Sequence, residues 1–320
     1  MVLGKLDRRR FLTHVPLAVA GAHLLRAQGG EVIAQSASGK LRGVDVEGIK
    51  VFKGIPYGES TTGKNRFMPP VKPAPWTGVR DALMFGHSSP QNGQVAPGSP
   101  AMGEDCLALN VFTPGLGAGK RPVMVWLHGG GFATGSGSRP IYDGKNLARA
   151  GDTVVVSINH RLNVFSSTYL GEALGSDFAL SGSVGILDII ASLHWVRDNI
   201  AQFGGDPNQV TIFGQSGGGR KVATLMAMPD AKGLLQRAII ESGAVLRLTT
   251  KEDAIRFTEL LLAELNLPRD KARELQNVPV PALLAANNAV LKKIKMPEVG
   301  MVANSPMVDG KAIPRHPWDP

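Results

Sequence analysis

Apolar positions along the chain form short runs separated by glycine- and proline-rich turns. From Glu31 to Phe52, apolar and polar residues alternate, and Ser38-Gly39 and Glu47-Gly48 mark turns, so short strands are predicted there. Four later runs lack this alternation, which is typical of strands buried on both faces of a mostly parallel sheet. These runs cover 107–113, 122–127, 153–158 and 210–213, and a further strand is predicted over 235–240.

Helical periodicity lies between these strands. From Ile186 to Ala201 the apolar residues share one broad face, and Gly204-Gly205-Asp206-Pro207 ends that helix. Further helices are predicted over 222–228, 251–265 and 272–286. The segment from Gly58 to Ser99 is rich in Pro, Gly and Ser and is predicted to be surface loop. Strands that alternate with helices predict an α/β fold, with a central sheet flanked by helices.

One predicted strand ends in a turn that contains a serine. Val210-Thr211-Ile212-Phe213 runs into Gly214-Gln215-Ser216-Gly217-Gly218, a G-x-S-x-G pattern, and a predicted helix follows. This order is the context that a nucleophile elbow requires, because flanking glycines let strand and helix pack closely around a strained serine. The Ser216 hydroxyl would project beside a helix N-terminus, which favours developing negative charge. The pattern alone would also suit a flexible Gly/Ser loop.

A second glycine-rich turn follows the strand predicted over 122–127. It is His128-Gly129-Gly130-Gly131. Consecutive glycines let several backbone N–H groups turn toward one oxygen without side chains in the way, and esterases use such a loop as an oxyanion hole. A flexible glycine turn is the alternative. The presence of both patterns in one chain favours a catalytic loop.

These turns and other motifs make the chain resemble the type-B carboxylesterases, the cholinesterase-like branch of the α/β-hydrolases that includes bacterial para-nitrobenzyl esterases. The resemblance extends from about Gly39 to the C-terminus. It also rests on Phe52-Lys53-Gly54-Ile55-Pro56-Tyr57, Arg66-Phe67, Glu104-Asp105-Cys106-Leu107-Ala108-Leu109-Asn110, Asn159-His160-Arg161-Leu162 and the run from Trp195 to Pro207.

The resemblance implies an α/β-hydrolase domain over 28–320, with the helices predicted over 251–265 and 272–286 at the position of a cap. By position, Ser216 corresponds to the nucleophile, and Gly130, Gly131 and the Gly217 amide correspond to the oxyanion hole. The implied reaction is hydrolysis of a small-molecule carboxylic ester through an acyl-enzyme, without a cofactor or a metal. A non-catalytic binding protein on the same fold is the alternative, although the retained Ser216 and glycine loop favour the enzyme.

The acid and the histidine of the triad are not recognisable. In this fold they follow the serine, and His316 is the only histidine after Ser216. The proline after His316 restricts its backbone, and no strand with an acid precedes it at a suitable distance. The earlier histidines His128, His160 and His194 are expected to be structural. The resemblance therefore implies a hydrolase truncated before the last strands of its sheet.

Three differences from the cholinesterases bear on the substrate and on disulfide formation. The loop from Gln91 to Gly103 contains no aromatic residue, and Gln215 stands where cholinesterases have glutamate. A quaternary ammonium needs an aromatic face and benefits from a carboxylate, so choline esters are poor candidates. Ser89 occupies the position of the family's disulfide partner for Cys106, the single cysteine of the chain. We therefore expect Cys106 to be a small buried hydrophobe.

Composition and charge are consistent with a globular protein and are most informative at the N-terminus. The chain has 320 residues, of which 43% are hydrophobic and 19% charged, as in a globular protein. Its net charge of +9 includes no basic block beyond the first residues, which argues against nucleic-acid binding. Arg8-Arg9-Arg10-Phe11-Leu12 precedes an apolar stretch too short to span a bilayer stably. These features predict a twin-arginine signal peptide over 1–27 and bacterial export to the periplasm or medium. A disordered basic tail is the alternative.

Overall fold

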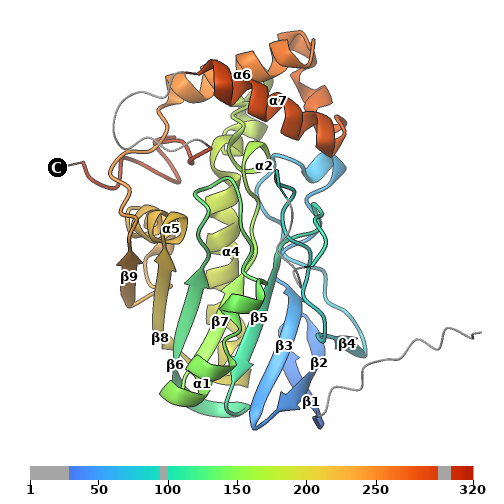
Figure 1. The fold of residues 1–320 in the computed structure, drawn as a ribbon, viewed down its shortest axis with the longest axis vertical. Helices are drawn as coiled ribbons and strands as arrows, with labels where there is room; N and C mark the ends of the chain where they lie inside the picture. The colour runs from blue at the N-terminus through green and yellow to red at the C-terminus, as the bar shows by residue number, and fades with distance from the viewer. Residues whose placement is uncertain (1–28, 94–99, 295–303, 320) are drawn as a thin grey trace, which may run out of the picture.

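The computed structural model describes residues 29–93, 100–294 and 304–319. Its described part is built on a nine-stranded sheet in the order β1-β2-β3-β5-β7-β6-β8-β9, with β4 beside β2 (Figure 1). The strands are β1 Glu31–Ser36, β2 Gly39–Val46, β3 Ile49–Pro56, β4 Val79–Asp81, β5 Ala108–Thr113, β6 Gly117–Leu127, β7 Val154–Ile158, β8 Phe203–Gln215 and β9 Arg237–Glu241. The predicted signal peptide over 1–27 lies outside the described residues.

The sheet is mixed. Strands β7, β6, β8 and β9 are parallel neighbours, as the uninterrupted apolar runs predicted. Strands β1, β2, β3 and β5 pair antiparallel in succession, and β5 also pairs antiparallel with β7. Strands β5 and β7 are both buried on both faces. Their apolar patterns therefore do not show whether a strand pairs parallel or antiparallel with its neighbours. The parallel half carries both glycine-rich turns.

Seven α-helices surround the described sheet. They are α1 Lys145–Gly151, α2 Val164–Ser167, α3 Gly171–Leu174, α4 Val184–Asn199, α5 Gly217–Met226, α6 Lys251–Glu264 and α7 Val280–Lys293. Strand β7 shows how the two faces are filled. Val154 and Val156 belong to the core that contains α4, whereas Val155 packs with Ala148 of α1. Successive side chains of a strand point to opposite faces, so the apolar run of β7 serves both layers.

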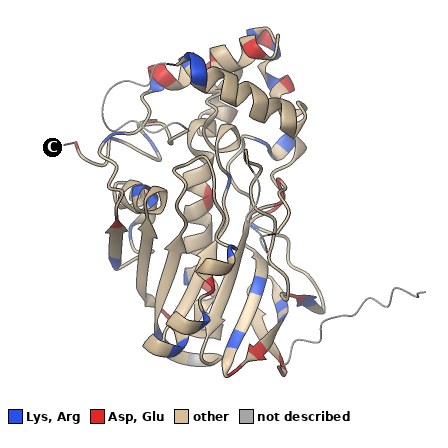
Figure 2. Cartoon of the chain, in the orientation of Figure 1, with Lys and Arg blue, Asp and Glu red and all other residues tan. Residues whose placement is uncertain are grey.

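Helices α6 and α7 lie together beyond the carboxyl ends of the parallel strands (Figure 1). They share a separate apolar core with residues of α2 and of the loop around Phe67. Basic and acidic residues both occur along these two helices (Figure 2). This arrangement matches the cap position that the resemblance implied. It places a cover over the edge of the sheet where β6 and β8 end.

The helix predicted over 272–286 is interrupted. A 3-10 segment covers Arg269–Gln276, and α7 begins only at Val280. The reason is local: Pro279 has an extended backbone and stands before the helix, and Pro281 lies in its first turn. Proline lacks an N–H donor and disfavours helical geometry in the residue before it, so two prolines separate the segments. Apolar periodicity alone did not reveal this break.

One helical run in the described ranges, 176–202, is long and apolar enough to cross a membrane by length and composition. However, 78% of its most apolar window is buried inside the protein. This run contains α4, which contacts β8 and α5. Burial in the core therefore accounts for its apolar composition.

Candidate active site

Ser216 stands between β8 and α5 in a rare backbone conformation. Its φ is 54° and its ψ is −117°. A side chain at such a positive φ is strained and persists only where surrounding contacts hold it. Here the Ser216 N–H donates to Glu241 O of β9 at 2.8 Å, and Ser216 O accepts from the Arg220 N–H at 3.1 Å. Strand β9 and the first turn of α5 therefore hold the serine from both sides.

Glycines make this turn possible because other backbone lies against them. A Cβ atom on Gly214 would stand 2.5 Å from the carbonyl carbon of Gly218. A Cβ atom on Gly218 would stand 2.0 Å from Leu127 O, and one on Gly243 would stand 2.1 Å from Ser216 O. The close strand–helix packing that the G-x-S-x-G pattern predicted is therefore present.

The glycine loop after β6 lies directly against the Ser216 turn. Gly130 and Gly131 have φ values of 94° and 63°, which glycine adopts readily. A Cβ atom on Gly129 would be 3.7 Å from Ser216 Cβ, and one on Gly217 would be 2.2 Å from Gly131 N. The structure thus brings together Ser216, Gly130, Gly131 and Gly217, the four residues predicted from the sequence. The glycine loop and the turn that carries Ser216 are therefore in direct contact.

Two polar side chains that sequence reasoning did not single out hold the far end of this loop. Gln91 accepts from the Gly135 N–H at 2.7 Å and donates to Gly135 O at 2.8 Å. Asn163 has a φ of 48° and donates from Nδ2 to Pro90 O at 2.8 Å and to Ala133 O at 3.1 Å. Asparagine tolerates positive φ better than most residues. Asn163 directly follows the Asn159-His160-Arg161-Leu162 motif, and this position is the sequence signal that could have identified it.

His128 and His160 are structural, as expected. Their rings stack at 4.9 Å between centroids, and both side chains are buried. Burial lowers the pKa of His128 to about 3, with the nearby charge of Lys221 as the next cause. The pKa of His160 is also well below its usual range, for the same two reasons in the same order. Both rings are therefore neutral near pH 7, and His128 Nδ1 lies 2.8 Å from Gly129 O.

Lys221 of α5 is another residue that was not predicted from the sequence. Its side chain is fully buried, and Nζ donates to His128 O and to Gly131 O, both at 2.9 Å. Burial lowers its pKa to about 7. Lysine is almost never fully buried without a partner. The residue type alone therefore predicts an exposed side chain at position 221.

Two buried ion pairs involve charged residues of the family motifs. Arg161 donates from Nη2 to Asp188 of α4 at 2.6 Å and from Nη1 to Met68 O at 2.7 Å. Arg66 contacts Glu104 at 2.6 Å and also donates to the carbonyl oxygens of Leu275 and Val278. The first pair joins the segment after β7 to α4. The second joins the loop after β3 to the segment before β5, and the other hydrogen bonds of Arg66 reach the segment ahead of α7.

His316 is not hydrogen-bonded to Ser216 in this structure. Its Nδ1 accepts from the Leu248 N–H at 3.1 Å. Asp309 accepts from the N–H groups of Lys311 and Ile313, as a turn residue does. Within the ranges that the structure describes, no histidine is hydrogen-bonded to Ser216, and no three His, Cys, Asp or Glu side chains are grouped to hold a metal ion.

Cys106 is buried, as expected, and forms no disulfide. Burial raises the pKa of its thiol to about 12. Ser89, at the position of the family's cysteine partner, is also buried, and its hydroxyl accepts from the Leu162 N–H at 3.1 Å. Ser89 thus makes a hydrogen bond to the segment after β7.

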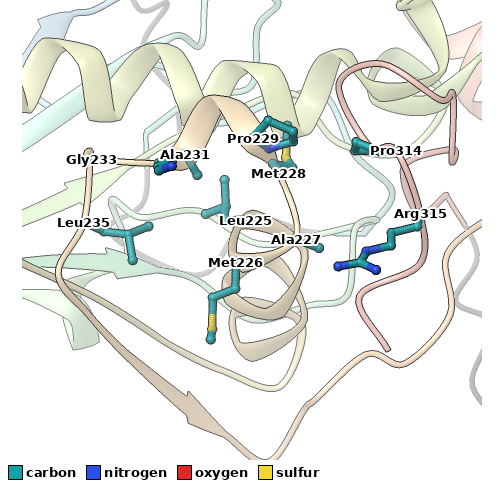
Figure 3. A pocket seen from close by; sticks show the side chains of 11 residues that line it. Leu225, Met226, Ala227, Met228, Pro229, Ala231, Gly233, Leu235, Pro314 and Arg315 are labelled. Carbon is teal, nitrogen blue, oxygen red and sulfur yellow. The ribbon is translucent and has the colours of Figure 1, made fainter. Parts of the chain in front are cut away.

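A cavity of about 620 Å³ lies at the C-terminal end of α5 (Figure 3). Leu225, Met226, Met228 and Leu235 line it together with Arg315. Neither Ser216 nor the glycine loop contributes to its wall. Ser216 and this cavity therefore lie at opposite ends of α5.

Comparisons with known proteins agree with this site. The model of the "Carboxylesterase family" matches residues 30–319. The para-nitrobenzyl esterase of Bacillus subtilis is 40% identical over 89% of this chain, and the phenmedipham hydrolase of Pseudarthrobacter oxydans is also 40% identical over 89%. Among solved structures, carboxylesterase EST55 of Geobacillus stearothermophilus superposes with a TM-score of 0.80 at 42% identity, and a thermophilic PNB esterase superposes with 0.83 at 40%. Each structural match covers 89% of this chain.

The chain spans 57% to 59% of the length of these four relatives. The solved structures share its sheet and helices, which confirms the predicted α/β-hydrolase fold. The family match covers nearly every described residue, including both glycine-rich turns. On these grounds the chain belongs to the carboxylesterase family.

Proposed function

We propose that this chain provides the nucleophile and the oxyanion hole of a serine esterase that hydrolyses carboxylic esters of small molecules. One observation carries the proposal: a serine held at positive φ lies against a loop of three glycines. Strain of this kind is expensive and is retained where it serves a reaction. Membership of the carboxylesterase family supports the same reaction class.

In the proposed reaction, Ser216 Oγ attacks the carbonyl carbon of the ester while a general base accepts the hydroxyl proton. The carbonyl oxygen becomes an oxyanion, which the N–H groups of Gly130, Gly131 and Gly217 stabilise. Collapse of this intermediate expels the alcohol, protonated by the base, and leaves an acyl-serine. A water molecule then attacks the acyl carbon and releases the acid.

The reaction needs a base, and none of the described histidines is hydrogen-bonded to Ser216. Without a base the serine hydroxyl stays protonated and is a weak nucleophile. We therefore propose that this chain by itself turns over esters slowly. An oxyanion hole and substrate binding alone provide roughly 10³- to 10⁴-fold acceleration over water. The whole-length relatives are named for esterase and hydrolase activity.

For substrates, we propose small uncharged esters with an aromatic alcohol or acyl part. One relative is named for a para-nitrobenzyl ester. Choline esters are not proposed, because Gln215 offers no negative charge and is exposed beside Ser216. A quaternary ammonium is bound best by an aromatic face with a carboxylate nearby.

The test uses the full chain and a fluorophosphonate probe at high concentration with long incubation, so that even a slowly reacting serine accumulates a stable adduct. Mass spectrometry is expected to find the adduct on Ser216 and to find none in Ser216→Ala. Ser176→Ala, at an exposed serine of a 3-10 turn, is the matched control and should label normally. An adduct on another serine, or equal labelling of Ser216→Ala, would refute the assignment. Binding of an ester without any labelling would favour the non-catalytic alternative.

We also propose export through the twin-arginine route, on the basis of Arg8-Arg9-Arg10-Phe11-Leu12. A fusion of residues 1–35 to a reporter should be exported, and Arg8→Lys combined with Arg9→Lys should stop export. If export were unchanged in that variant, or absent from the unmodified fusion, the proposal would be wrong.

A further inference from the structure

The buried Lys221 joins the nucleophile helix to the glycine loop. It lies in the second turn of α5, the helix that begins directly after Ser216. Its Nζ donates to the carbonyl oxygens of His128 and Gly131, and it lies 5.7 Å from the centroid of the Phe132 ring. In the described part of the chain, no carboxylate forms an ion pair with this Nζ. Burying an ammonium without such a partner costs stability, so the position calls for a functional reason.

The two acceptors are placed where they can orient the loop. A peptide group is planar, and its C=O and N–H point in opposite directions. A hydrogen bond to His128 O therefore fixes the direction of the Gly129 N–H, and one to Gly131 O fixes that of the Phe132 N–H. Between these anchored peptides lie residues that glycine leaves conformationally free. One amino group thus restrains both ends of the segment 129–131.

We propose that Lys221 is a positioning residue of the oxyanion hole. Its amino group holds the glycine loop against the helix that begins after Ser216, by fixing the two peptide groups that flank the Gly130 and Gly131 amides. This inference rests on the proposed function, because an oxyanion hole has meaning only for an acyl-transfer site.

Among Lys221, His128 and His160, Lys221 is the group whose pKa lies near neutrality. His128 and His160 are neutral near pH 7, because burial and Lys221 lower the pKa of each. Arg161 is paired with Asp188 of α4, and Arg139 also acts on His128. The pKa of Lys221 itself is about 7, lowered by burial. Below that pH the group is an ammonium, and above it the charge is lost while two N–H donors remain.

The first experiment compares the full chain with Lys221→Met, Lys221→Arg and, as matched control, Lys232→Met, at an exposed lysine beyond α5. Two properties are measured: protection of the 128–135 amides from hydrogen exchange, and the rate of fluorophosphonate labelling of Ser216. Lys221→Met should lower the labelling rate by about tenfold to a hundredfold, because a displacement of about 1 Å at a reacting centre costs up to about that much. It should also lower amide protection, because the loop loses both hydrogen bonds to Lys221. Lys221→Arg should recover part of the loss, because it keeps the charge and the donors, and Lys232→Met should match the wild type. Wild-type protection and labelling in Lys221→Met would overturn the proposal.

The two readouts separate this inference from the proposed function. If Ser216 of the wild type fails to label, the esterase proposal fails, while hydrogen exchange still decides whether Lys221 positions the loop. If Lys221→Met does not fold, the wild type is titrated by NMR with ¹³C-labelled lysine and ¹⁵N-labelled glycine. The amide shifts of residues 129–131 should then move with the same midpoint as the Lys221 Cε resonance. Loop shifts that do not follow that midpoint would contradict the proposal.

Discussion

Backbone strain at Ser216 leads to a prediction that reverses an ordinary rule of protein stability. At most positions, replacement by glycine destabilises a protein more than replacement by alanine, because glycine loses more backbone entropy on folding. At Ser216 the φ of 54° and ψ of −117° correspond to the first central position of a type II′ turn, which glycine prefers. Ser216→Gly is therefore expected to be more stable than Ser216→Ala.

The size of this difference follows from two opposing contributions. Relief of the strained conformation is worth about 1–3 kcal/mol, and the extra entropy of glycine in the unfolded chain offsets about 0.4–1 kcal/mol. The net advantage of Ser216→Gly over Ser216→Ala is thus about 1–2 kcal/mol in the free energy of unfolding. The Ser216 side chain forms no capping hydrogen bond to α5. Ser216→Ala should therefore unfold close to the wild type.

The assay is urea unfolding followed by tryptophan fluorescence, together with fluorophosphonate labelling. Neither variant at 216 should label, since both lack the hydroxyl. Ser176→Gly and Ser176→Ala form the matched control pair, because Ser176 is exposed and is not among the positive-φ residues. At 176 alanine should be the more stable. If glycine is also the less stable variant at 216, the serine is not strained and our account of the turn is wrong.

Three further changes test other parts of the site. Asp188→Asn leaves the Arg161 charge buried and unpaired, so unfolding in urea should show a loss of about 3–5 kcal/mol. Gly218→Ala places a Cβ atom 2.0 Å from Leu127 O and should lower the melting temperature and Ser216 labelling together. For Lys221, the unfolded chain keeps the proton up to about pH 10.5, whereas the folded chain releases it near pH 7. Wild-type stability should therefore rise across that window relative to Lys221→Met, by at most about 1.4 kcal/mol per pH unit.

A specific result would contradict each of these three predictions. Asp198→Asn removes a partly exposed pair with Arg197 and should cost less than about 1 kcal/mol. Equal losses at 188 and 198 would mean that burial of the Arg161 pair is unimportant. A Gly218→Ala variant with unchanged melting and labelling would show that the turn relaxes easily. A pH-independent difference between the wild type and Lys221→Met would show that Lys221 releases its proton at the same pH in both states.

The sequence by itself determined the local part of the candidate site. A strand, a glycine-rich turn and a helix follow one another within about twenty residues around Ser216, and each is encoded by near neighbours. The same is true of β6 and the glycines after it. Because both turns follow strands of a parallel sheet, their meeting at one edge was also predictable. The resemblance then named Ser216, Gly130, Gly131 and Gly217 as a group.

Only the tertiary structure decided the features that depend on distant partners. The antiparallel direction of β5 comes from its pairing with β3 and β7, not from its own apolar pattern. Lys221 lies in a helix where its residue type predicts exposure, yet the carbonyls of His128 and Gly131 surround its amino group. Gln91 likewise comes from a loop without any periodic pattern. Burial and hydrogen-bond partners are properties of the assembled fold, and a single residue's identity does not contain them.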